Sequence, residues 1–154
     1  VDAVLADVAR VLRPGAPFVF CVPSHNFLPN LSLARFFDRI GLRAAAAAYR
    51  RFFNRISRHH HCDPPEVWCD RLERAGFDVD RWWHYFSPDA LQVLEWGHYF
   101  GLPALASKTL FGRWILAPTD WNLALTRAIT QSSYDEPRQQ PNGSYTFYIT
   151  RRKE

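Results

Sequence analysis

Apolar residues recur at helical spacing from the start of the chain, at Val1, Val4, Leu5, Val8, Val11 and Leu12. This spacing predicts a helix that ends at the Arg13-Pro14-Gly15 turn. A continuous apolar run, Phe-Val-Phe-Cys-Val, follows at positions 18–22. Such a run is typical of a strand that is covered on both faces in a parallel sheet. The order of helix, turn and buried strand therefore predicts an α/β fold.

Helical spacing returns over residues 31–58, with a break at Gly41. This stretch is too long for a simple connection, so we expect a helical insertion over about 27–62. Asp63 then fits an N-cap and Pro64 the first position of a short helix that ends at Gly76. A strand is expected over 77–86.

Ser87-Pro88-Asp89 is a second helix start, and it opens another expected helical insertion over about 87–131. Helical pieces are expected near 104–111 and 121–130, while the pattern does not fix the course of 112–118. The polar stretch 131–140 predicts a surface loop. Apolar and polar residues alternate from Tyr145 to Thr150, which predicts an antiparallel last strand.

The composition fits one domain, because 154 residues of which 47% are hydrophobic can form one sizeable core. No signal peptide pattern and no apolar run of about 18 residues is present, so the expected location is the cytoplasm. Three cysteines at irregular spacing are interpreted as reduced thiols.

The net charge of +4 is unevenly distributed, since residues 35–58 contain seven arginines and a single acid, Asp38. Nucleic acid, anionic lipid or an anionic substrate would each suit such a surface, and a solvated helix face explains it equally well.

Three segments, LADVARVLRPGAPFVFCVP, WCDRLERAGFDV and YTFYI, together resemble class I SAM-dependent methyltransferases of the type 11-like group. LADVARVLRPGAPFVFCVP at 5–23 is similar to the helix, "RVLRPGG" turn and strand of that family, with Ala16 in place of the second glycine. WCDRLERAGFDV at 68–79 is similar to a later helix-to-strand junction, and YTFYI at 145–149 to the antiparallel last strand.

The resemblance implies a fold and a cofactor. The expected fold class is α/β, the C-terminal part of a Rossmann-like methyltransferase sheet with parallel strands, an antiparallel last strand and helical insertions. Residues 1–154 would form a partial methyltransferase domain whose N-terminal SAM-binding half is missing, because no Gly-rich loop follows a strand. S-adenosylmethionine would be bound mainly by residues absent from this chain.

Ser24, His25 and Asn26 stand directly after the first strand, where open α/β sheets place their ligands. We expect them to contact substrate, although Ser and Asn also serve in turns. No serine lies in a G-x-S-x-G elbow, so Ser-His hydrolysis has no support.

Arg58-His59-His60-His61-Cys62-Asp63 is the densest polar group in the chain and precedes a helix. His59, His60 and His61 are the candidate catalytic residues, because methyl transfer to an O–H or N–H acceptor needs a group that takes the proton. Two other interpretations remain open, a metal site without supporting ligand spacing and simple packing at a helix start. No metal is expected.

Aromatic residues crowd positions 82–86, and Trp96, Trp114 and Trp121 follow. They suit a pocket for an apolar acceptor, a helical core or a membrane-contacting surface. Trp68 and Tyr85 are the expected substrate-binding aromatics.

The sequence favours SAM-dependent methyl transfer to a small-molecule or lipid-linked acceptor, with this fragment inactive alone and no nucleic-acid partner. The alternative is a non-enzymatic module whose basic and aromatic insertions dock on a membrane or partner protein. Half of a nicotinamide-binding oxidoreductase is a third hypothesis, and it lacks its glycine fingerprint too.

Overall fold

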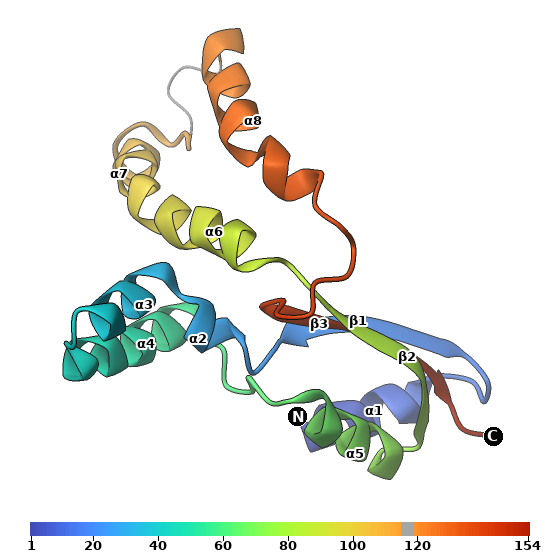
Figure 1. The fold of residues 1–154 in the computed structure, drawn as a ribbon. Coiled ribbons are helices and arrows are strands. Elements are labelled where there is room, and N and C mark those ends of the chain that lie inside the picture. Colours follow the sequence, from blue (N-terminus) through green and yellow to red (C-terminus); the bar gives the residue numbers. More distant parts are fainter. Residues whose placement is uncertain (115–118) are drawn as a thin grey trace.

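The computed structural model describes residues 1–114 and 119–154, and the side chains of all of these except 98–100, 102, 103 and 122. A three-stranded sheet lies at its centre (Figure 1). The strands are β1 (Pro17–Pro23), β2 (Phe77–Tyr85) and β3 (Tyr145–Arg152), in the spatial order β1-β3-β2. β3 is antiparallel to both neighbours.

The expected parallel Rossmann-like sheet is therefore wrong, because both pairs of neighbouring strands in the described residues are antiparallel. β1 and β2 do run in the same direction, but β3 separates them. The expectation failed because a local pattern identifies a strand without identifying the strand beside it. Only the antiparallel direction of β3, predicted from its alternation, is confirmed.

One face of the sheet is covered, by α1 (Asp2–Val11) and α5 (Pro65–Arg74). These helices and the strands bury a shared core that consists of Leu5, Trp68, Leu72, Phe77 and Tyr148. Each fully buried large apolar side chain contributes about 1.5–3 kcal/mol. The opposite face is more open, and Val19 on β1 is 50% exposed. The expectation that β1 is covered on both faces is thus also wrong.

The start of α5 differs from the expectation, while its end agrees. Pro64 is the N-cap and Pro65 the first helical residue, so Asp63 does not cap the helix. The Asp63 carboxylate instead accepts a hydrogen bond of 2.6 Å from Arg71. Gly76 has a φ of 87°, the left-handed conformation expected at the end of this helix.

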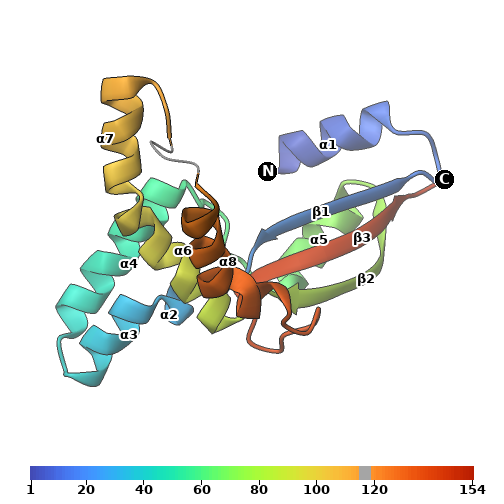
Figure 2. The ribbon, with the colours of Figure 1, turned by 90° about the horizontal axis from the view of Figure 1, so that it is seen from above.

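The first helical insertion consists of α2 (Phe27–Asn30), α3 (Ser32–Arg39) and α4 (Arg43–Ser57). α3 and α4 form a hairpin that turns at Gly41, where φ is 82°. A second buried cluster joins them to α6 and consists of Phe27, Leu31, Ala34, Tyr49, Phe53 and Leu91. Figure 2 shows this hairpin extending away from the end of the sheet.

The second helical insertion consists of α6 (Pro88–Phe100), α7 (Leu102–Phe111) and α8 (Asp120–Tyr134). The Ser87 hydroxyl accepts a 3.1 Å hydrogen bond from the Ala90 N–H, which confirms the expected helix start. α8 continues four residues into the expected 131–140 loop. Residues 115–118 of the expected insertion lie outside the described residues.

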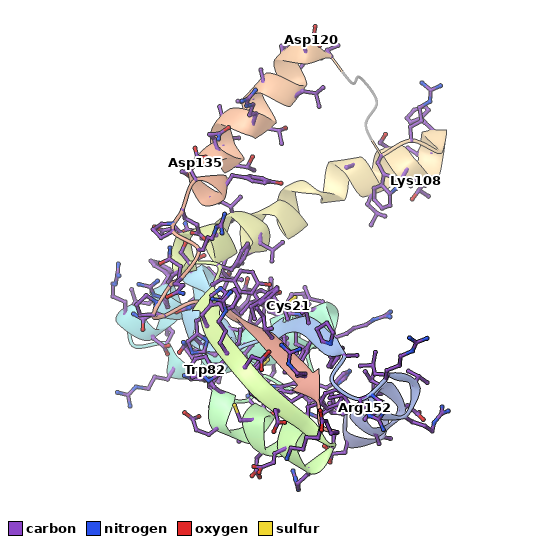
Figure 3. The ribbon with its side chains drawn as sticks, turned by 90° about the vertical axis from the view of Figure 1, so that its right-hand side faces the viewer. Cys21, Trp82, Lys108, Asp120, Asp135 and Arg152 are labelled. Carbon is purple, nitrogen blue, oxygen red and sulfur yellow. The ribbon has the colours of Figure 1, made fainter. Side chains whose placement is uncertain are left out.

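Figure 3 shows α8, between the labelled Asp120 and Asp135, rising away from the sheet. Cys21 and Trp82 mark β1 and β2, the two outer strands, in the same view. Within 1–114 and 119–154, no helix combines the length and the apolar character that crossing a bilayer requires.

Candidate functional site

Most of the predicted site residues lie around one edge of the sheet, where β1 and β2 end and β3 begins. The strand register places Pro23, Tyr145 and Tyr85 side by side across this edge. The 24–26 segment continues from β1, and α6 follows β2 after Phe86 and Ser87. This edge is therefore the candidate functional site.

Ser24 and Asn26 use their polar groups to hold the turn that precedes β3. The buried Ser24 hydroxyl donates to the Gly143 carbonyl at 2.8 Å and accepts from the Asn26 N–H at 3.1 Å. The Asn26 side-chain amide donates to the same carbonyl at 3.4 Å. The turn chemistry considered for Ser and Asn is thus present, and Ser24 has no exposed surface.

His25 is exposed and lies against a second histidine, His84 of β2, with 5.5 Å between the ring centroids. His84 Nδ1 is 2.8 Å from the Thr146 hydroxyl. Burial lowers the pKa of His84, and the charge of His25 lowers it further. The lowered pKa favours the neutral imidazole of His84, which can accept or donate a hydrogen bond.

His59 is the only one of the three consecutive histidines that lies in the aromatic cluster at the sheet edge. Its ring contacts Phe27 and Tyr145 edge-on, with centroid distances of 4.5 and 6.0 Å. Its Nδ1 is buried and has no hydrogen-bond partner among the described residues. Burial lowers the pKa of His59, and the neighbouring His60 lowers it further.

His60 and His61 do not join this cluster. His60 is exposed, and His61 Nδ1 lies 3.7 Å from a carboxylate oxygen of Asp63. That carboxylate is already bound to Arg71. The structure therefore separates the three candidate catalytic residues, with His59 inside and the other two toward solvent.

Trp68 and Tyr85 lie on opposite faces of the sheet. Trp68 is buried beneath it and packs on Phe20 and Tyr148, so its ring belongs to the core. Tyr85 is half-buried on the more open face and contacts Tyr145, with 6.0 Å between centroids. Burial raises the pKa of Tyr85, and a hydrogen bond with Cys21 raises it further. The two expected substrate-binding aromatics cannot share one ligand.

The sequence interpretation missed Tyr145, which connects the site. Its ring contacts those of Phe27, His59, Tyr85 and Phe86. Burial raises its pKa to about 12. The alternation that identified β3 places Tyr145 on the same face as Phe147, but the cross-strand register with Tyr85 was needed to find this contact.

An apolar groove continues from this edge between α6 and α8. Its first part, about 400 Å³, is lined by Tyr85, Phe86, Val93 and Tyr134 among others. A second part of about 520 Å³ is lined by Val93, Trp96 and Ile129 among others. The size and apolar lining suit a small organic ligand.

No group of three or more His, Cys, Asp or Glu side chains in the described part of the chain could hold a metal ion. Comparison with protein families, with curated proteins and with solved structures finds no match for this chain.

Proposed function

We propose that this chain forms the acceptor-binding part of a SAM-dependent methyltransferase, and that residues 1–154 alone do not catalyse the transfer. The acceptor is a small molecule or the head of a lipid-linked compound. One observation carries the proposal: the antiparallel last strand pairs between β1 and β2, the two strands that follow the family-like motifs.

The topology supports the resemblance because it joins three motifs that are distant in the sequence. The VLRPGA turn precedes β1, the AGF junction opens β2, and the YTFYI segment forms β3. β1 and β2 both end at the candidate site, and a helical insertion follows each of them. Varied insertions at one edge of a sheet are a common way to build a specific substrate pocket.

The described residues do not fit S-adenosylmethionine by themselves. β1 leads through Ser24, His25 and Asn26 directly into α2, with no Gly-rich turn that would let a backbone approach the cofactor. The side chains of Ser24 and Asn26 are bonded to Gly143. The proposal therefore assigns the cofactor to residues outside this chain.

The residues at the sheet edge instead line a groove in which the acceptor would bind. The apolar groove between α6 and α8 begins at Tyr85 and Phe86, beside Tyr145. His59 lies in the same aromatic cluster with a lowered pKa, so its imidazole is neutral at pH 7 and can take a proton from an acceptor hydroxyl or amine. Nδ1 is enclosed, so Nε2 would make that contact.

The decisive experiment compares this chain with the product of its whole gene. Calorimetric titration with SAM should show binding only for the longer protein. The longer protein should transfer a labelled methyl group to compounds from a cell extract. His59→Gln should reduce that transfer about a hundredfold or more, the usual contribution of a positioned base.

His60→Gln is the matched control, because His60 neighbours His59 in sequence but is exposed. It should leave the transfer rate within a factor of about two. If the longer protein fails to bind SAM, or if the DNA upstream of the Val1 codon encodes no strand followed by a G-x-G-x-G loop, the proposed function is wrong.

A further inference from the structure

The tip of the α3–α4 hairpin exposes large apolar side chains. Phe36, Ile40 and Leu42 are each 51% exposed, and all three lie within seven residues around the Gly41 turn. Figures 1 and 2 both show this turn at the far end of the hairpin from the sheet. The three side chains therefore lie at a projecting point of the molecule, outside the groove and the buried clusters.

Three arginines alternate with these apolar residues. Arg35, Arg39 and Arg43 are exposed, and among the described residues none of them forms an ion pair. The one acid of the segment, Asp38, is bound to Arg50 at 2.5 Å. The tip thus combines exposed apolar side chains with three arginines that form no ion pair in the part of the chain that the structure describes.

The hairpin is held firmly enough to present this tip. Ala34, Ala46 and Phe53 are fully buried between its helices and the neighbouring cluster. The buried Glu95 carboxylate of α6 also accepts hydrogen bonds from the first two N–H groups of α3. The body of the hairpin is therefore packed against the rest of the fold, and the tip projects from it.

We propose that this tip binds the surface of an anionic lipid bilayer, with Phe36, Ile40 and Leu42 inserted at the headgroup boundary and the three arginines on lipid phosphates. A projecting tip cannot enclose a small ligand, whereas it can enter a soft interface. Apolar side chains beside basic ones are the combination that gives interfacial binding to anionic membranes. Arginine stems can pack beside the inserted residues while their charges stay at the phosphates.

This inference is independent of the proposed methyl transfer, because it uses neither the sheet edge nor the groove. For the basic segment 35–58, the sequence alone left nucleic acid, anionic lipid and an anionic substrate as possible partners. The tip selects anionic lipid among them. A membrane-bound hairpin would also hold the candidate site near a lipid-linked acceptor.

Vesicle flotation tests the proposal. The chain should float with vesicles of one part phosphatidylserine to two parts phosphatidylcholine at low salt, and less well as salt rises. The triple variant Phe36→Ser, Ile40→Ser and Leu42→Ser should weaken partitioning about a hundredfold, from about fivefold for each half-exposed side chain. Changing Arg35, Arg39 and Arg43 to Gln should produce a loss of similar size, about fivefold per charge, and should flatten the salt dependence.

A control variant changes three apolar side chains that lie outside the hairpin, on the second helical insertion. Leu110, Phe111 and Leu123 on α7 and α8 are 74%, 63% and 53% exposed, more than those of the tip. Replacing them with Ser should leave flotation unchanged, and circular dichroism should verify that each variant is folded.

Three results would overturn the proposal. The first is no flotation of the unchanged chain on the anionic vesicles. The second is normal flotation of the folded tip variant, or loss of flotation only in the α7–α8 control. The third is retention on single-stranded DNA without flotation, which would assign the arginines to nucleic acid.

Discussion

Replacing Glu95 should strongly destabilise the helical part of the fold. This carboxylate is fully buried, and it joins three elements. One oxygen accepts a 2.6 Å hydrogen bond from the Ser32 N–H, and the other accepts from the Leu33 N–H at 3.2 Å and the Tyr49 hydroxyl at 2.6 Å. The N-cap residue of α3, Leu31, has no side chain that could cap the helix. Glu95 provides that cap from α6.

The cost follows from the groups that would lose their partner. Glu95→Ala leaves the Ser32 and Leu33 N–H groups without their acceptor, and each such loss costs about 1–3 kcal/mol when the group is buried. A total of roughly 2–6 kcal/mol is a large part of the 5–15 kcal/mol that is typical of a domain. Glu95→Gln should cost roughly 2–3 kcal/mol, since the amide nitrogen cannot accept a hydrogen bond. Tyr49→Phe removes one bond and should cost about 1 kcal/mol.

Urea unfolding followed by circular dichroism measures these differences. Because Glu95 and Tyr49 share a hydrogen bond, the Glu95→Gln and Tyr49→Phe changes together should cost less than the sum of both, by about 0.5 kcal/mol or more. Glu73→Ala, at an exposed position of α5, is the control and should change stability by about 0.5 kcal/mol or less. If Glu95→Ala stays within about 1 kcal/mol of the unchanged protein, the capping argument is refuted.

Three further experiments test other parts of the structure. Gly143→Ala should destabilise by roughly 2–3 kcal/mol, because an added Cβ would lie 2.6 Å from the Tyr85 backbone nitrogen, whereas Gly97→Ala in open space within α6 should stabilise by up to about 1 kcal/mol. Equal effects in thermal unfolding would contradict this reasoning. Burial lowers the pKa of His59 from its usual value, so the folded state binds a proton at this side chain less tightly than the unfolded chain does. The stability that the neutral His59 side chain provides is therefore complete above about pH 6.5 and is lost as the pH falls through the lowered pKa. His59→Phe should therefore reduce the acid sensitivity of stability, and an unchanged pH profile would argue against it. Burial raises the pKa of Cys62 to about 11. Iodoacetamide at pH 8 should therefore label the exposed Cys21 before Cys62, and mass spectrometry can follow the order. The reverse order would contradict the burial of Cys62.

Features set by neighbouring residues could be predicted from the sequence. Gly41 and Gly76 interrupt apolar patterns and both adopt the left-handed conformation at a turn. Ser87 precedes a proline and caps α6 as expected. These features depend on a few consecutive residues, so a local pattern contains the information that they need.

The sheet could not be predicted in the same way, because strand pairing is a long-range property. Phe20 pairs with Tyr148, and no local pattern specifies that partner. The unbroken apolar run of β1 suggested burial on both faces. In the described residues the helices cover the Phe20 side, while Cys21 on the other side is exposed.

The candidate site shows the same division between local and long-range information. The position of Ser24 after a strand correctly placed it at the sheet edge. Its role depends on Gly143, 119 residues away, to which its hydroxyl donates. A buried hydroxyl bonded in this way holds the turn before β3, so Ser24→Ala should lower stability by about 1 kcal/mol in urea unfolding. The positions of other side chains at this edge, such as His25 beside His84 and Tyr85 beside Tyr145, depend in the same way on where the three strands meet.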